Sequence, residues 1–169
     1  GMEVTIRPGG PVDVSGEGAA TREWVVASVH SRFDHDPTER VLAAMESPYV
    51  DCIGHLTGRK IGTRQPAPVD VERVVEQALA TGTFLEINSQ PDRLDLSDVH
   101  ARAAREAGLK LVIDSDGHQV GALDYVELGV GLARRAWPER DGVLNTRTWK
   151  QVEKLKKKRP RRSGKHSTL

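Results

Sequence analysis

The sequence predicts an α/β fold built on a parallel β-sheet. Short apolar segments alternate with amphipathic segments of helical periodicity, at intervals of roughly 25 to 30 residues, which is the spacing of consecutive βα units. Five segments have the length and composition of strands, and the last, Leu111–Ile113, is a continuous apolar run typical of a buried parallel strand. Five strands are too few to close a (β/α) barrel of seven or eight. The first strand also begins without a preceding cap, so we expect an earlier part of the architecture to be missing.

The strands are predicted from their composition and from the residues that interrupt them. The first alternates apolar and polar residues and is broken by Pro8 and Gly9, after which the composition to Glu17 is that of a loop. The later strands are apolar runs bounded by polar or glycine-containing segments. In chain order, the expected strands are Met2–Arg7, Trp24–His30, Cys52–Ile53, Thr83–Asn88 and Leu111–Ile113, with a further short strand at Val143–Asn145.

The helices are predicted from apolar residues at three- and four-residue spacing and from residues that favour helix ends. Asp36 and Pro37 supply an N-cap and a first-turn proline, and Gly82 and Gly108 supply stop signals. The expected helices span about residues 36–45, 70–80, 97–108 and 122–137, the last as one or two helices, and a terminal helix begins at Thr146 or Thr148. The expected inward residues are Val41, Leu42 and Met45 in the first helix and Trp149, Val152 and Leu155 in the last.

Length and charge indicate one domain with a basic tail. A chain of 169 residues has the size of a single domain. Residues 150–169 carry nine Lys or Arg and one Glu, a formal charge of +8, and because the whole chain carries +1, residues 1–149 carry −7. From Pro160 the segment has almost no apolar residues. We therefore expect a domain at residues 1–158 and a disordered basic tail at residues 159–169.

The composition also indicates the cellular location. No apolar run approaches the roughly 18 to 20 residues that a membrane span needs, and the N-terminus lacks the pattern of a signal sequence. Cys52 is the only cysteine, so no internal disulfide can form, and we expect a buried thiol in a reducing compartment. The sequence thus predicts a soluble, cytoplasmic protein without a membrane partner.

Two carboxylates and an imidazole follow the strand at residues 111–113. Asp114, Asp116 and His118 stand where a parallel strand ends, and in such folds the residues past the carboxyl ends face the ligand site. Asp and neutral His both ligate divalent metals, and Asp116 and His118 can reach one ion from an extended backbone. The alternative is a polar turn with Gly117 at a positive φ.

Histidines also follow two other predicted strands. His30 ends the second strand, His55 follows the third, and Glu3 lies inside the first. Because the carboxyl ends of parallel strands share one edge, these residues can converge with Asp116 and His118 on a metal. The alternative for each histidine alone is a hydrogen-bonded core or surface residue. His35, His100 and His166 lack this context, and we assign them to the surface.

These segments resemble the C-terminal part of a PHP (polymerase and histidinol phosphatase) domain. The similarity is greatest to the PHP domain of bacterial X-family DNA polymerases and related PHP phosphoesterases, and it extends from Gly1 to about Lys158. It rests on the segments GMEVTIR, VVASVHSRF, GHLTGR, LEINSQPDRLDL, VIDSDGH and LGVGLARRAW followed by LNT. The resemblance implies part of a distorted, TIM-like (β/α)₇ barrel that lacks the first βα units.

The resemblance implies a metal-dependent phosphoesterase that hydrolyses phosphate esters with a metal-activated water and no catalytic side chain. It implies up to three divalent ions of zinc, manganese or iron, and a 3′–5′ exonuclease linked to an X-family DNA polymerase. The alternatives are a stand-alone phosphatase of the histidinol-phosphatase type, or an inactive partial barrel that associates with another segment or copy through its open edge. The implied metal ligands are Glu3, His30, His55, Asp116 and His118.

The chain departs from the family pattern in three places. The family's first strand carries a His-x-His motif that this sequence lacks, so we expect at least one metal to be bound poorly or not at all. Leu56 stands where the family usually has proline, and Gly117 where alanine is usual. Neither of these two changes removes a ligand.

Other polar residues are candidates for binding substrate or supporting the metals. Arg59 lies in a glycine-rich loop and is suited to bind phosphate with two parallel hydrogen bonds, the alternative being a surface salt bridge. For Arg93 and the pair Arg134–Arg135, structural pairing is favoured. Glu86 either supports a histidine ligand or fixes Asn88 and its loop. The basic tail can neutralise DNA phosphates or remain solvated and uninvolved.

Overall fold

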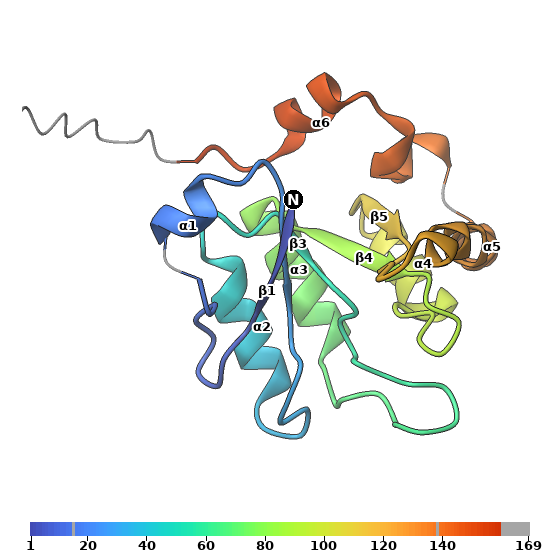
Figure 1. Ribbon diagram of the computed structural model, residues 1–169, viewed down its shortest axis with the longest axis horizontal. Helices are drawn as coiled ribbons and strands as arrows, with labels where there is room; N and C mark the ends of the chain where they lie inside the picture. Colours follow the sequence, from blue (N-terminus) through green and yellow to red (C-terminus); the bar gives the residue numbers. More distant parts are fainter. Residues whose placement is uncertain (15, 138, 160–169) are drawn as a thin grey trace, which may run out of the picture.

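The computed structural model describes residues 1–14, 16–137 and 139–159, which form an α/β fold around a five-stranded parallel sheet (Figure 1). Each strand pairs with the next one in the chain, so that the order is β1-β2-β3-β4-β5. The strands are β1 (Met2–Thr5), β2 (Val25–Ser28), β3 (Cys52–Ile53), β4 (Phe84–Asn88) and β5 (Leu111–Asp114). The predicted class is thus confirmed, and the sheet is consistent with part of a TIM-like fold.

Helices cover one face of the sheet and contribute its larger apolar core. Val41, Val74, Ala104 and Leu132, one from each of four helices, are all buried in this core. The α-helices are α1 (Gly16–Ala20), α2 (Pro37–Met45), α3 (Val71–Thr81), α4 (Asp98–Glu106), α5 (Val126–Ala136) and α6 (Trp149–Leu155), with 3₁₀ turns η1 (Val120–Tyr125), η2 (Arg140–Gly142) and η3 (Leu144–Thr146). Among these described helices, none is long and apolar enough to cross a membrane.

The other face of the sheet changes from apolar to polar along the strands. Because side chains alternate along a strand, every second residue of β4 points to this face, in the order Phe84, Glu86 and Asn88. Near the amino ends of the strands, a second apolar cluster is closed by Leu144 of η3 and Val152 of α6. The polar residues therefore collect toward the carboxyl ends, where the sequence predicts the site.

The terminal region differs from the prediction in two respects. Residues 143–145 are not a strand: Val143 makes a single parallel bridge to Leu111, and a 3₁₀ turn begins at Leu144. In α6, Val152 is buried, whereas Trp149 and Leu155 are exposed. The apolar spacing identified the helix correctly but not its inner face, because α6 is short and only its middle reaches the sheet.

Two smaller predictions also need correction. The segment from Pro8 to Glu17 was predicted as loop, but α1 begins at Gly16. Asp36 occupies the N-cap position of α2, as predicted, yet its side chain makes no capping hydrogen bond and its backbone is left-handed. By contrast, the Asp70 side chain does cap α3, and Gly82 ends that helix with a φ of 70°.

The outer strands of the sheet are partly covered. On β5, the Asn145 side-chain amide pairs with the backbone N–H and C=O of Ile113, both at 2.8 Å. On β1, Asp13 bonds to both backbone groups of Thr5, at 2.8 and 2.9 Å. Covered backbone groups cannot pair with another strand. These contacts therefore reduce the free edge available for the predicted self-association.

The segment after α6 is anchored at the amino ends of the strands. Asp51, which precedes β3, is fully buried and lies 3.4 Å from Lys156 Nζ and 2.5 Å from Arg159 Nη2. The Lys156 ammonium also lies over the rings of Trp24 and Trp149. Arg159, which the prediction assigned to the tail, is therefore held by the domain. Residues 160–169, including His166, lie outside the described residues.

Candidate metal centre

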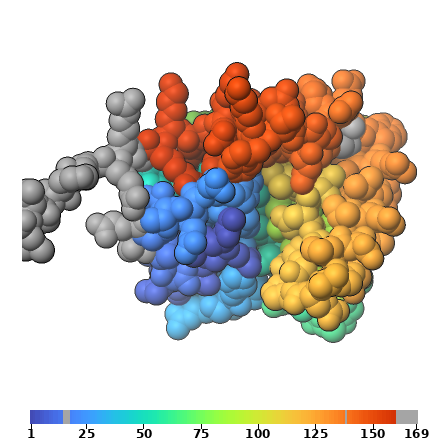
Figure 2. All heavy atoms as spheres, turned by 45° about the horizontal axis from the view of Figure 1, so that its top comes forward, coloured from blue at the N-terminus to red at the C-terminus, as the bar shows by residue number. Residues whose placement is uncertain are grey.

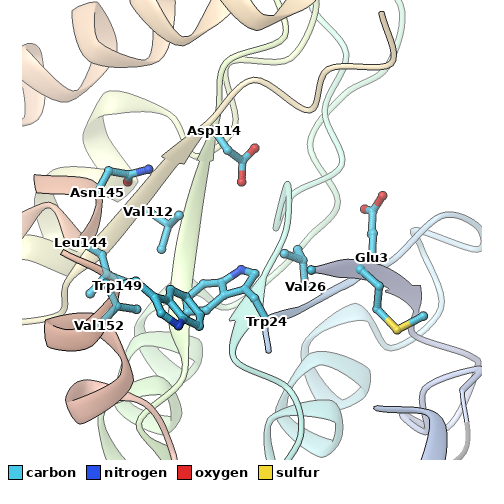
Figure 3. Close-up of a pocket in the computed structure, with 11 residues that line it drawn as sticks. Glu3, Trp24, Val26, Val112, Asp114, Leu144, Asn145, Trp149 and Val152 are labelled. Atoms are coloured by element: carbon cyan, nitrogen blue, oxygen red, sulfur yellow. The ribbon is translucent and has the colours of Figure 1, made fainter. Parts of the chain in front are cut away.

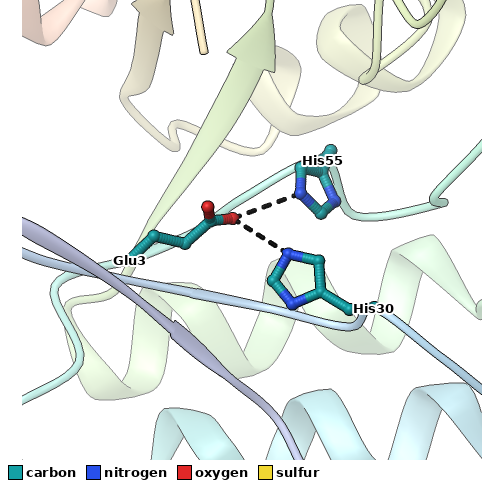
Figure 4. A group of neighbouring side chains, drawn as sticks. All are labelled: Glu3, His30 and His55. Carbon is teal, nitrogen blue, oxygen red and sulfur yellow. Dashed lines mark ion pairs between the residues drawn. The ribbon is translucent and has the colours of Figure 1, made fainter. Parts of the chain in front are cut away.

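Three side chains from adjacent strands meet beside the sheet (Figure 4). Glu3 lies on β1. His30 lies two residues after the end of β2, and His55 lies two residues after the end of β3. Glu3 Oε1 is 3.3 Å from His30 Nε2 and 3.2 Å from His55 Nε2. One potential ligand atom from each of the three residues lies within 4.8 Å of the others. The structure thus brings together the three predicted ligands that the first three strands contribute.

The arrangement of these side chains fits a divalent metal. Both histidines direct Nε2 at the same carboxylate, and His30 Nδ1 lies 3.2 Å from Thr5 Oγ1, which leaves Nε2 as the ligating nitrogen. His55 is 3% exposed and its Nδ1 has no hydrogen-bond partner. Two imidazoles and a carboxylate form a donor set that zinc, manganese and iron all accept.

The contacts in this group shift the pKa values of Glu3 and His30. Hydrogen bonds from His30 and then His55 hold the pKa of Glu3 far below its usual range. The hydrogen bond to Glu3 raises the pKa of His30 above its ordinary value. A proton on His30 therefore competes with a metal for the same nitrogen.

We expect this ion pair to make the stability of the metal-free protein depend on pH. The contribution of Glu3 is present above its ordinary pKa of 4.5 and is lost as the pH falls through its lowered pKa. The contribution of His30 is present below its ordinary pKa of 6.5 and is lost as the pH rises through its raised pKa. Urea unfolding measured at a series of pH values should show the largest contribution of the ion pair to stability between pH 4.5 and pH 6.5. The Glu3→Gln variant should lack it, and identical pH profiles for the two proteins would contradict the assignment.

Buried polar side chains hold the backbone of His55 in place. Glu86 accepts hydrogen bonds from the backbone N–H of His55 and from Asn88 Nδ2. Burial, and next the neighbouring Asp114, raises the pKa of Glu86 well above its ordinary value. Glu86 therefore supports the backbone of His55 rather than its ring, and it also fixes Asn88, so both roles considered for it are combined.

Gly54 allows the end of β3 to approach these groups. A Cβ atom at this position would lie 2.4 Å from Ser28 Oγ and 2.8 Å from Val26 Cγ1. Real Cβ atoms do not come so close to their neighbours, so only glycine fits without movement. Close packing against Val26 and Ser28 of β2 therefore requires glycine at position 54, next to His55.

Two of the predicted ligands have left-handed backbones. His55 has a φ of 25° and Asp116 a φ of 47°, a conformation that costs non-glycine residues on the order of 1 kcal/mol or more. The alternative reading of this segment, a polar turn, places a positive φ at Gly117, but the structure has it at Asp116. Gln90 Nε2 holds this turn by donating to the carbonyl oxygens of Ser115 and Asp116. Sequence reasoning missed Gln90, although its position just after β4 was the available signal.

Asp116 and His118 lie outside the group of three. Asp116 Oδ2 accepts from Asn88 Nδ2 at 3.0 Å, and its negative charge contributes to the raised pKa of His30. The His118 side chain is 82% exposed, with Nδ1 2.9 Å from the Asp116 carbonyl oxygen. Asp116 is thus within electrostatic reach of the centre, while His118 faces solvent.

The remaining candidates have mainly structural contacts. Arg59 donates through Nε to the Arg93 carbonyl oxygen at 2.8 Å and through Nη2 to that of Leu94. Arg135 pairs with Asp98 on the surface, as favoured from sequence. His35 is exposed, but His100 is half-buried, so the surface assignment is only partly correct for His100. Cys52 is buried, as expected.

Two cavities are lined by predicted ligands, the larger by Glu3 and the smaller by Asp116 and His118. The larger, about 520 Å³, is mostly apolar, with Glu3 and Asp114 toward one end and Trp24 and Trp149 toward the other (Figure 3). In Figure 2, a recess lies between the blue N-terminal segments and the yellow and orange segments around β5 and α5. The smaller cavity, about 310 Å³, is polar and is lined by Lys60, Gln90, Asp92, Arg93, Asp116, His118, Gln119, Ala122 and Tyr125.

The chain is similar to proteins whose names denote an exonuclease or a phosphatase. The chain is 40% identical over 161 residues to a protein of Bacillus subtilis named DNA polymerase/3′-5′ exonuclease PolX, covering 94% of this chain and 28% of that protein. It is 32% identical to a probable phosphatase of Thermoanaerobacter sp., covering 75% of this chain and 52% of that protein. It is 31% identical to a probable phosphatase of Caldanaerobacter subterraneus, covering 83% of this chain and 58% of that protein. No family model matches the chain.

Exonucleases and phosphatases both hydrolyse phosphate esters, so the names of these relatives share one type of reaction. The chain spans between 28% and 58% of the length of these three relatives. The names of the relatives describe two activities. One is that of an exonuclease joined to a polymerase, and the other is that of a phosphatase.

Proposed function

We propose that this chain is a PHP-type, metal-dependent phosphoesterase region, with residues 1–158 as the domain and Glu3, His30 and His55 as its central metal ligands. The convergence of the His30 and His55 imidazoles on one carboxylate oxygen of Glu3 is the observation that carries the proposal. Asp116 and His118 are proposed as further ligands from the resemblance to the PHP pattern. Asn88 Nδ2 links the Asp116 carboxylate to that of Glu86, which holds the backbone of His55.

The chain's own residues would each have a distinct task in hydrolysis. Bound divalent ions would supply an acidified water and a positive charge opposite the phosphoryl oxygens. Glu3 orients the imidazoles of His30 and His55, because its Oε1 atom contacts Nε2 of both. Glu86 fixes the backbone of His55 by accepting a hydrogen bond from its N–H, and Asn88 fixes the carboxylate of Asp116 by donating to it. Arg59 was predicted to bind the substrate phosphate, but its carbonyl contacts favour a role through the loop at residues 93–94.

Hydrolysis assays test this proposal. The protein is incubated with Mn²⁺ and either single-stranded DNA or small phosphomonoesters, and hydrolysis of one of them is the expected result. Glu3→Gln should remove the activity, whereas His35→Ala, at an exposed histidine outside the site, should not change it. Absence of hydrolysis of both substrates by the wild type would overturn the proposal.

For the substrate, we favour DNA, as in a 3′–5′ exonuclease linked to an X-family polymerase. The match to PolX has higher identity and covers more of this chain than the two phosphatase matches. A small phosphoester, as for a stand-alone phosphatase, is the second candidate. A DNA substrate predicts binding that weakens steeply with salt, whereas a small phosphoester predicts a shallow salt dependence.

A partial barrel that acts by association is also proposed as an alternative. The larger cavity is lined by residues of both outer strands, including Met2 of β1 and Val112 of β5. A monomer in light scattering that retains tightly bound metal would contradict this alternative. The covered edges at Thr5 and Ile113 favour that result.

A further inference from the structure

We propose that α6 and the segment that follows it bind single-stranded nucleic acid, at the end of the sheet opposite the metal centre. The proposed contacts are Trp149, Lys150, Lys154 and Lys158. This inference goes beyond phosphoester hydrolysis, because it assigns a separate, non-catalytic site. It also differs from the expectation drawn from sequence, in which the DNA contacts lie in the tail that begins at residue 159.

The chain from α6 to the last described residue is strongly basic. Residues 149–159 carry six Lys or Arg and one Glu, a formal charge of +5. Further Arg and Lys residues follow at positions 161, 162 and 165. In Figure 1, α6 and the segment after it lie on the same side of the molecule as the N-terminus. Positive charge gathered on one segment is the electrostatic footprint of a nucleic-acid contact.

Three of these cations anchor the segment to the domain. Lys156 and Arg159 both pair with the buried carboxylate of Asp51. Lys157 Nζ donates to the carbonyl oxygen of Met45, at the end of α2, at 2.5 Å. These contacts fix the backbone of the segment, so the remaining cations are presented from an ordered surface.

The other three lysines of the segment are available to a ligand. Lys150, Lys154 and Lys158 are exposed, and among the described residues none of them has an ion pair or a hydrogen bond. Lys150 and Lys154 are four residues apart on α6, so they lie on the same side of the helix. Lysines without an internal partner can neutralise phosphates and release the counterions that surround nucleic acid.

Trp149 supplies an aromatic surface beside these lysines. It is the first residue of α6, directly before Lys150, and is 42% exposed. The residues that line a cavity of about 250 Å³ at this surface are Glu23, Trp149, Glu153, Lys156, Lys157 and Arg159. Nucleobases of any sequence stack on exposed aromatic rings, and single-strand sites combine such rings with a basic groove. The tail from residue 159 contains no Phe, Tyr or Trp, so α6 supplies the aromatic residue that the tail lacks.

The helix is less suited to a membrane surface. Its apolar residues, Trp149, Val152 and Leu155, recur every third position, and Val152 in the middle is buried against the sheet. A helix that lies in a membrane interface buries a continuous apolar face in the lipid. Because the protein itself covers the middle of that face in α6, a single strand is the better partner for the exposed ring and lysines.

The surface lies away from the metal centre. Asp51, which anchors the segment, directly precedes β3, whereas His55 follows the carboxyl end of the same strand. The amino and carboxyl ends of parallel strands form opposite edges of a sheet. Nucleic acid bound at α6 therefore leaves the metal centre free, and the two sites can hold different parts of one strand.

Fluorescence anisotropy with a labelled oligodeoxythymidine of about 16 nucleotides tests the inference. The whole 169-residue chain is used, in EDTA, so that bound metal plays no part. The wild type should bind, with an affinity that falls as salt rises. Lys150→Ala, Lys154→Ala and Lys158→Ala combined should weaken binding roughly 100-fold at about 0.1 M salt and make the salt dependence shallower by about two logarithmic units per decade.

The control for the lysine variant removes the same charge elsewhere. Arg73→Ala, Arg102→Ala and Arg135→Ala combined lower the net charge equally, at exposed arginines that pair with acidic residues on the outer helices. This control should weaken binding far less than the lysine variant, because its positions lie outside the proposed surface.

Trp149→Ala should weaken binding about 5- to 150-fold, the loss expected for one stacked base. Trp149→Phe should retain most of the affinity, because phenylalanine keeps an aromatic ring. Trp137→Ala is the matched control, since Trp137 is exposed at the end of α5.

The inference is overturned if the wild type binds no oligonucleotide, or if either the lysine variant or Trp149→Ala binds as tightly as its control. Binding of vesicles that contain phosphatidylserine, in place of the oligonucleotide, would assign the surface to a membrane and would also overturn it. Because hydrolysis is not measured, a protein that hydrolyses no ester can still support this inference, and an active phosphoesterase can still refute it.

Discussion

Replacing His55 by alanine is expected to abolish metal binding at the candidate centre. His55 is nearly fully buried, and its Nε2 faces the carboxylate oxygen that His30 also contacts. Removing a partner outside the ligand sphere costs 10- to 100-fold in metal affinity, so losing a ligand should cost at least about 100-fold. Elemental analysis after dialysis against Zn²⁺ or Mn²⁺, together with calorimetric titration, measures the effect.

A second variant separates loss of a ligand from loss of the fold. His55→Ala also leaves a cavity, because His55 is buried. His30 is exposed, so His30→Ala should lower the thermal midpoint less than His55→Ala does and still lose metal. His35→Ala provides the control, because it removes an exposed histidine that lies outside the cluster. Wild-type metal content in both His55→Ala and His30→Ala would refute the site.

The fold was largely predictable because its determinants are local. Apolar runs mark the strands and helical spacing marks α3 and α4, and both signals are contained in short windows. The errors lie where tertiary contacts decide. Residues 143–145 have the composition of a strand, but Asn145 pairs with β5 through its side chain rather than its backbone. The inner face of α6 depends on how much of the helix reaches the sheet.

Three of the five predicted ligands lie together in the structure, but the detailed geometry of the site could not be predicted from the sequence. Parallel strands place residues at and after their carboxyl ends on one edge of the sheet, and the sequence therefore predicts that Glu3, His30 and His55 come together, as the structure has them. It could not place His118, because a side chain on a turn takes its direction from the backbone φ of Asp116. The burial of Arg40 also has no signal in sequence, since a charged residue on a helix normally faces solvent.

Arg40 is the residue whose replacement should most destabilise the fold around the site. It lies on α2, is 2% exposed, and donates to four backbone carbonyl oxygens, those of Ile6, Arg7, Ser31 and Arg32. Two of these acceptors follow β1 and two follow His30. The guanidinium therefore ties together the loops that leave the strands of Glu3 and His30.

Arg40→Met is expected to lower the free energy of unfolding by about 3 kcal/mol. Methionine fills similar space but leaves the buried carbonyl oxygens without their donor, at a cost of roughly 1 to 3 kcal/mol for each oxygen that water does not reach. Arg73→Met removes an exposed pair with Glu39 and should cost less than about 1 kcal/mol. Urea unfolding compares the two variants. Equal effects would show that the Arg40 contacts contribute no more than a surface ion pair. If Arg40 does organise both loops, its loss should also weaken metal binding, because His30 directly precedes Ser31, one of the acceptors.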